Sequence, residues 1–138
     1  MQKQENLSKN QKIILDLIEK SSGPLKAYSI LFNVKKQGIK APLQVYRALD
    51  KLIEIGKIHK IESRNAFVAC KNSNCQVSKA TAFSICESCE DVTEVSNLKL
   101  SKYLSNFADK SGMKYNKYNL EFFGCVKTVK NSLFFNNI

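Results

Sequence analysis

The chain has 138 residues, of which 43% are hydrophobic and 25% charged, a composition typical of globular rather than disordered proteins. It contains no run of about 18 apolar residues, and its polar first residues lack the apolar core of a signal peptide. The sequence therefore excludes a bilayer span and predicts a cytoplasmic protein. Lys and Arg number 22 against 12 Asp and Glu, and this net charge of +10 favours a polyanionic partner such as DNA.

The first part of the chain predicts three helices. Ser8 and Gln11 form a capping-box pattern, so a helix is expected to begin near Lys9. Apolar residues at helical spacing predict a second helix over residues 26–37. Pro42 suits the first turn of a third helix, because its missing N–H would have no partner there in any case.

A hairpin is expected next. Between Ile58 and Cys70 the apolar spacing changes, and residues 63–65 read as a turn. Three helices followed by a hairpin are the order of elements in a winged helix-turn-helix domain. We therefore predict a DNA-binding winged-helix domain over residues 1–70, and a hinge over the polar residues 71–79.

The remaining residues, 80–138, predict a small β-β-α-β unit in which Asn97 caps the helix. Apolar side chains expected on the inward face of this helix are Leu100, Tyr103, Leu104, Phe107 and Ala108. The unit is too small for a robust core of its own, so dimerisation, a metal or both should stabilise it. The expected fold class is α+β: an N-terminal winged helix-turn-helix domain followed by a small α/β dimerisation domain. The tail over residues 126–138 either extends the dimer sheet or stays loose.

Polar side chains of the third helix and the hairpin are the candidates for DNA contact. Arg reads guanine and Gln reads adenine through paired hydrogen bonds, whereas Lys contacts phosphates. The helical candidates are Gln44, Tyr46, Arg47 and Lys51, joined by Tyr28 near the start of the second helix. The hairpin candidates, expected to contact the DNA backbone, are Lys57, Lys60 and Arg64. The competing interpretation is a set of ordinary solvated side chains, which is the better one for Lys51 taken alone.

The chain has five cysteines and one histidine. An odd number of cysteines in a cytoplasmic protein argues against a disulfide framework and favours metal binding or redox chemistry. The sequence holds no nucleophile–base pair and no glycine-rich phosphate loop, so we do not expect an enzyme.

One stretch, APLQVYRALDKLIEIGKIHKIESRNAFVAC at residues 41–70, resembles the ferric uptake regulator family, and within it the zinc uptake regulator branch. SSGPLKAYSIL before it and FSICESCEDVTE after it extend the resemblance to most of the chain. The resemblance implies a homodimeric, metal-responsive repressor. Its winged helix would bind a palindromic double-stranded DNA operator, and its C-terminal module would dimerise and hold zinc. No small-molecule substrate other than the metal ion is implied.

The resemblance also implies two groups of ligands for Zn²⁺. Cys86 and Cys89 match the first pair of the family's structural site, whose second pair is reduced here to Cys125. The site is then either a three-thiolate site completed by an outside ligand or one that has decayed, and a redox pair is the alternative to zinc.

The second group matches the family's regulatory site and contains His59, Cys70 and Glu94. The usual linker histidine is replaced by Lys79, and Cys75 either takes its place or is an exposed loop thiol. Thiolate and imidazole ligands suit Zn²⁺. An iron-responsive or a peroxide- or thiol-responsive regulator on the same scaffold is the alternative.

Overall fold

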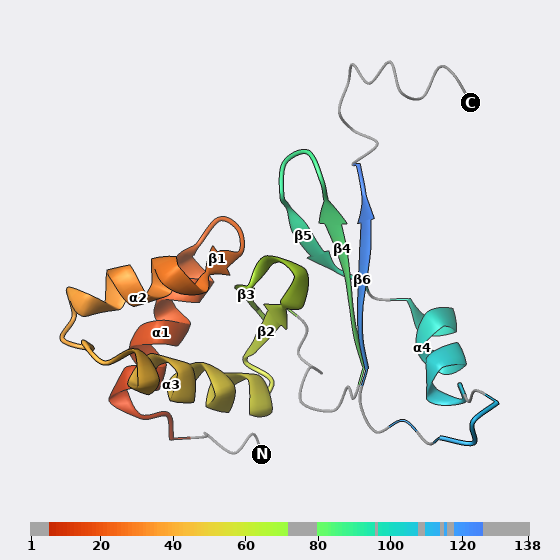
Figure 1. Ribbon diagram of the computed structural model, residues 1–138, viewed down its shortest axis with the longest axis horizontal. Coiled ribbons are helices and arrows are strands. Elements are labelled where there is room, and N and C mark those ends of the chain that lie inside the picture. Colours follow the sequence, from red (N-terminus) through yellow and green to blue (C-terminus); the bar gives the residue numbers. More distant parts are fainter. Residues whose placement is uncertain are drawn as a thin grey trace. The chain divides into compact units, whose positions relative to one another are not determined.

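The computed structural model describes residues 6–71, 80–95, 97–107, 110–113, 115 and 118–125 (Figure 1). The chain divides into two compact units, residues 1–78 and 79–138. Each unit has a three-stranded sheet, and four helices accompany the two sheets in the described part of the chain. The predicted α+β class is confirmed. No helix among these described residues is both long and apolar enough to cross a membrane.

The first unit has the predicted order of helices and hairpin. Its elements are α1 (Lys9–Lys20), β1 (Leu25–Lys26), α2 (Ala27–Lys35), α3 (Pro42–Glu54), β2 (Ile58–Ile61), the 3-10 turn η1 (Glu62–Arg64) and β3 (Ala66–Ala69). The capping box is confirmed, because the backbone N–H of Gln11 donates to Ser8 Oγ at 3.2 Å and that of Ser8 donates to Gln11 Oε1 at 3.0 Å. The third helix begins at Pro42, as expected.

Two details of this unit differ from the expectation. The second helix ends at Lys35, two residues before the expected end, and Gly38 follows it with a left-handed φ of 92°. The short strand β1 was not foreseen. It pairs antiparallel with β3, with Leu25 opposite Phe67. A strand of two residues gives no periodic signal, since it exists only through a partner distant in sequence.

Each helix of the first unit buries one apolar face in a shared core. The side chains at its centre are Ile14, Ile18, Ile30, Val34, Val45, Leu49, Leu52, Ile58 and Phe67. The last two belong to the hairpin strands, so the hairpin is packed against the helices rather than appended to them. This packing fixes the outer face of α3 relative to the hairpin.

The second unit has the predicted β-β-α-β order, with β4 (Ala80–Cys86), β5 (Val92–Glu94), α4 (Leu98–Ser105) and β6 (Tyr118–Gly124). β4 lies at the centre of the sheet, antiparallel to β5 and parallel to β6. The predicted cap at Asn97 is confirmed, because the backbone N–H of Leu100 donates to its Oδ1 at 3.0 Å. Figure 1 shows α4 beside β6.

The predicted inward face of α4 is wrong. The helix has no buried residue, with Tyr103 65% and Phe107 44% exposed and Leu100 and Leu104 only partly covered; Ala108 lies outside the described residues. The apolar stripe exists, but α4 makes few contacts with the sheet of its own unit. An apolar stripe shows which side of a helix is apolar, but it does not show which surface packs against that side.

Replacing Leu52 by Ala should lower the free energy of unfolding by about 2–5 kcal/mol, because it opens a cavity at a fully buried position. Urea unfolding followed by circular dichroism measures the loss. The matched control is Leu43→Ala on the same helix, where the side chain is 60% exposed and the expected change is within about 0.5 kcal/mol. Equal losses in the two variants would contradict the assignment of the core.

Candidate functional site

The outer face of α3 carries the candidate reading residues. Gln44, Tyr46 and Arg47 are exposed, while Val45, Ala48 and Leu49 point into the core. Helical periodicity therefore puts the polar candidates on the side away from the core, as the sequence predicts. Lys51 is also exposed, but its Nζ lies 3.4 Å from Glu54 Oε2 in a surface ion pair.

Large apolar side chains are also exposed on α2 and α3. Tyr28 on α2 is 69% exposed and Leu43 on α3 is 60% exposed. Phe32, one turn after Tyr28, is 63% exposed and lies under the Lys36 ammonium, 5.1 Å from the ring centroid. Phe32 and Leu43 were not among the predicted residues, because an apolar residue type gives no sign that its side chain is exposed.

The tip of the hairpin is a tight turn rather than a simple loop. Asn65 adopts a left-handed conformation, with φ 45° and ψ 49°, directly after η1. Its carbonyl accepts a hydrogen bond of 3.1 Å from the backbone N–H of Ala27, which ties the hairpin to the start of α2. Asparagine tolerates this conformation better than most residues.

The three basic candidates of the hairpin differ in their surroundings. Lys57 is half-buried before β2, and Lys60 Nζ lies 3.3 Å from Glu62 Oε2. Arg64 is half-buried, and its Nε is enclosed without a hydrogen-bond partner among the described residues. A buried guanidinium N–H without an acceptor carries an energetic cost.

The strand register brings His59 and Cys70 together. His59 pairs with Val68 in the β2–β3 ladder, and the backbone N–H of Cys70 extends this ladder by donating to Lys57 O at 3.0 Å. Side chains alternate between the faces of a strand, so Cys70 shares a face with Val68 and is diagonal to His59. A ring nitrogen of His59 and Cys70 Sγ lie within 4.8 Å of one another. His59 is 8% exposed.

This pair offers one nitrogen and one sulfur ligand, which suit Zn²⁺. Cys70 is disulfide-bonded in the structure, so its sulfur becomes a ligand only in the reduced protein. Glu94 is half-buried at the end of β5, opposite Phe83 of β4. Cys75 lies outside the described residues.

Cys86, Cys89 and Cys125, here called the thiol centre, lie at one end of the second sheet. The parallel register ends with Cys86 opposite Gly124, and the backbone N–H of Glu87 donates to Gly124 O at 2.8 Å. Cys125 follows Gly124 directly and is therefore carried to the loop between the two other cysteines. Its Sγ lies 3.5 Å from the hydroxyl oxygen of Ser88 in that loop.

The loop of the thiol centre is closed by backbone hydrogen bonds. Glu90 has a left-handed φ of 63°, and its N–H donates to Cys86 O at 2.9 Å, while the N–H of Cys86 donates to Asp91 O at 2.9 Å. The turn brings the Cys89 thiol into a hydrogen bond with that of Cys86. None of these three cysteines is in a disulfide; Cys86 is buried and the other two are exposed.

The pKa of the Cys89 thiol depends on both Asp91 and Cys86. The backbone N–H of Asp91 bonds to it and lowers its pKa, but the hydrogen bond with Cys86 and the loss of hydration outweigh this, so the pKa of Cys89 is raised. The third thiol, that of Cys125, contacts Ser88, and the described thiols do not close into one tight cluster of ligand atoms. Sequence analysis missed Ser88, because only the parallel pairing of β4 and β6 reveals its position.

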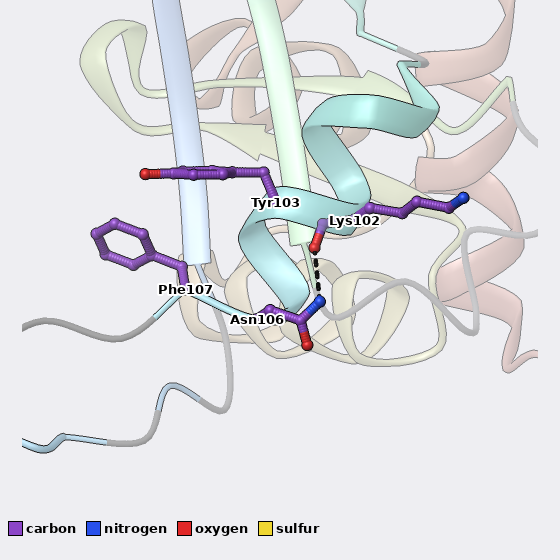
Figure 2. A pocket seen from close by; sticks show the side chains of 4 residues that line it. All are labelled: Lys102, Tyr103, Asn106 and Phe107. Carbon is purple, nitrogen blue, oxygen red and sulfur yellow. Dashed lines mark hydrogen bonds between the residues drawn. The ribbon is translucent and has the colours of Figure 1, made fainter.

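A shallow hollow of about 500 Å³ lies on the surface of α4, lined by Lys102, Tyr103, Asn106 and Phe107 (Figure 2). Asn106 Nδ2 donates to the Lys102 carbonyl at 3.3 Å. The Tyr103 and Phe107 rings lie 5.8 Å apart, and Tyr115 stacks on Phe107 at 5.7 Å. Among the described residues that line the hollow there is no histidine, cysteine or carboxylate, and two of the four are aromatic.

The chain is similar in sequence and in structure to known proteins. The chain is 38% identical over 82 residues to the zinc uptake regulation protein of Escherichia coli strain K12, a match that covers 59% of this chain and 47% of that protein. The chain thus spans about half the length of the curated relatives it matches.

Two solved structures are similar over most of the chain. One is a zinc uptake regulator complexed with zinc and DNA, with a TM-score of 0.79, 29% identity and coverage of 91% of this chain and 84% of that chain. The other is holo XcZur, with a TM-score of 0.78, 34% identity and coverage of 88% and 84%. The profile of the ferric uptake regulator family matches residues 2–123. Because this match includes both units, the chain belongs to the ferric uptake regulator family.

Proposed function

We propose that the chain is a zinc-responsive transcriptional repressor that binds palindromic DNA operators as a homodimer when it is loaded with metal, and that it is not an enzyme. The observation that carries the proposal is the His59–Cys70 pair, a nitrogen and a sulfur ligand within 4.8 Å in the hairpin of the DNA-binding unit. The similarity to a zinc uptake regulator complexed with zinc and DNA supports both the metal and the partner.

Exposure and charge support the DNA-binding role of the first unit. Tyr46 and Arg47 lie on the outer face of α3, where side chains can reach base edges in a major groove. Residues 1–65 hold 13 basic and 6 acidic side chains, against 9 and 6 in the rest of the chain.

The ligand chemistry supports zinc. We propose that His59, Cys70 and Glu94 hold the ion, with Cys75 as the fourth ligand in the reduced protein. Zn²⁺, when bound, supplies a tetrahedral centre that fixes its ligands at defined angles. One histidine and several cysteines favour zinc over Mg²⁺ and over the oxygen-rich ligand sets of iron sites.

The proposed zinc ligands come from both units, and in this proposal their common binding to one ion is how zinc regulates DNA binding. His59 and Cys70 belong to the DNA-binding unit, whereas Glu94 belongs to the second unit. When these side chains hold one ion, they restrict the orientation of the reading head relative to the dimerisation unit. Two reading heads at a fixed spacing can engage both halves of a palindrome, so the population competent for DNA binding rises.

The second unit supports dimerisation. Among its described residues the buried core is small, consisting of Ala82, Phe83, Ile85 and Cys86. Large apolar side chains are exposed around it, namely Leu98, Tyr103, Phe107, Met113, Phe122 and Phe123. A unit with little core and so much exposed apolar surface is typical of a subunit that buries this surface against a second copy.

One observation favours a second candidate function. Cys70 is disulfide-bonded in the structure, and a thiol-responsive regulator on the same scaffold would use this bond to control DNA binding. A zinc response that is complete under reducing conditions, and independent of added oxidant, would reject this candidate.

Replacing Glu94 by Gln should remove most of the zinc-dependent gain in operator affinity, because the amide supplies a weaker ligand without charge. The matched control is Glu90→Gln, which changes an exposed carboxylate a few residues earlier and should leave the gain intact. Fluorescence anisotropy with a labelled operator, in reducing buffer with and without zinc, measures the effect. Size-exclusion chromatography should find the same oligomer in both variants. A full zinc response in Glu94→Gln would reject this ligand.

Replacing Arg47 by Ala should weaken specific operator binding by about 1–3 kcal/mol and relax the preference at one base pair. Lys57→Ala should instead weaken binding to all DNA sequences equally, and should reduce by about 1 the slope of log affinity against log salt concentration. Lys20→Ala is the control, since Lys20 is paired with Asp16 on α1 at 2.9 Å and lies outside α3 and the hairpin. Competition binding at several salt concentrations separates these effects. Unchanged specificity in Arg47→Ala would reject α3 as the reading helix.

A further inference from the structure

The exposed face of α2 consists of aromatic and basic side chains. Tyr28, Phe32 and Lys36 are exposed and follow one another at intervals of four residues, which places them along one face of the helix and its C-cap. Lys35, next to Lys36 in the chain, is exposed as well. The opposite face of the helix is buried in the core of the unit. We call Tyr28, Phe32 and Lys36 the α2 stripe.

The two rings of the α2 stripe form an aromatic surface. Single exposed apolar residues are common on soluble proteins, but Tyr28 and Phe32 are 69% and 63% exposed one turn apart on the same face. The Lys36 ammonium lies 5.1 Å from the centroid of the Phe32 ring, within the range of a cation–π contact. A ring has two faces and an edge, so one ammonium leaves most of the Phe32 ring open to a partner.

The charge around the α2 stripe selects the class of partner. Residues 20–49 contain six basic side chains and no acidic one, so all 12 acidic residues of the chain lie outside this stretch. A second copy of the same face would bring like charges together and would be repelled. DNA attracts the positive charges through its phosphates, and the C–H groups of its sugars offer apolar surface to an aromatic ring. The composition of the stripe therefore matches a DNA backbone.

The place of α2 in the fold agrees with this partner. Residues 36–41 join α2 to α3, with Gly38 in a left-handed conformation, and both helices bury one face in the same core. Two packed helices joined by a short turn with a glycine form a helix-turn-helix. When the second helix of this motif enters the major groove, the first helix crosses the DNA backbone. Since α3 is the proposed reading helix, α2 is the helix expected to meet the backbone.

We propose that the α2 stripe binds the sugar-phosphate backbone of the DNA beside the groove that α3 enters. Phe32 packs against a deoxyribose, Lys36 contacts the neighbouring phosphate, and the Tyr28 hydroxyl donates to a phosphate oxygen. This inference rests on the DNA binding proposed above and adds Phe32 and Lys36 to the residues that carry it. Because sugars and phosphates are the same at every base pair, these contacts add affinity without sequence preference.

Variants of Phe32 in the 138-residue chain test the apolar contact. Phe32→Ala should weaken binding to a single-operator duplex and to an unrelated duplex by the same factor, about three- to tenfold, the loss expected for roughly half of a buried Phe side chain. Phe32→Tyr keeps the apolar body of the ring and should bind like the parent. Anisotropy in reducing buffer with zinc measures the affinities, and urea unfolding should find equal stability in all three proteins. Unchanged affinity in Phe32→Ala, or a loss confined to the operator, overturns the proposal.

A variant of Lys36 tests the phosphate contact. Lys36→Gln should reduce by about 1 the slope of log affinity against log salt concentration, because one fewer phosphate is neutralised. The matched control is Lys20→Gln, since Lys20 is already paired with Asp16 at 2.9 Å, and this variant should keep the slope of the parent. A slope in Lys36→Gln equal to that of the parent overturns the proposal.

Photo-cross-linking distinguishes DNA from a second copy of the chain as the partner of the α2 stripe. The variant Phe32→p-benzoylphenylalanine, loaded with zinc and irradiated on a duplex with one operator, should become attached to the DNA. Attachment to protein alone overturns the proposal, as does a loss of affinity in Phe32→Ala that needs two adjacent operators. Arg47→Ala is the reference in these assays. If it loses specificity while Phe32→Ala binds like the parent, this inference fails and the proposed function stands.

Discussion

The antiparallel register of β2 and β3 is the constraint on which the rest of the first unit depends. It places Ile58 opposite Ala69 and His59 opposite Val68. Since side chains alternate along a strand, Ile58 and Phe67 anchor one face of the hairpin in the helical core, while His59 and Cys70 share the other face. A shift of one residue would move the core anchors out and the ligands in. The hydrophobic core therefore holds the proposed ligand pair in position in the same unit as α3, the proposed DNA-binding helix.

The sequence predicts local structure correctly where a single residue determines where a helix begins. The capping box at Ser8, the first turn of α3 at Pro42 and the cap at Asn97 each depend on neighbours within three residues, and all are confirmed. Features that depend on distant partners were not predicted. The strand β1 exists only through β3, and the parallel pairing of β4 with β6 leaves no mark in either strand alone. The exposed face of α4 was misassigned because amphipathicity does not identify the covering surface.

The candidate sites also combine features that a local pattern predicts with features that depend on partners distant in sequence. That His59 and Cys70 are close follows from strand periodicity once the register is known, and their residue types alone suggested a metal. The contact between Ser88 and Cys125 joins residues 37 positions apart, so no local pattern reveals it. The two sites also differ in chemistry. The hairpin pair combines the buried nitrogen of His59 with the half-buried sulfur of Cys70, whereas the thiol centre has one buried and two exposed sulfurs.

The most direct test of the account is the DNA affinity of the unmodified, reduced protein as a function of free zinc. Duplexes selected from random sequence in the presence of zinc supply the operator, and anisotropy measures its dissociation constant in zinc-buffered solution, with Fe²⁺ and Mn²⁺ in parallel. Zinc should tighten specific binding by about 5- to 150-fold, the range of an allosteric coupling, and should do so at lower free concentrations than either other ion. Equal DNA affinity with and without zinc, or a gain in DNA affinity produced by Fe²⁺ but not by zinc, would contradict the proposed zinc response.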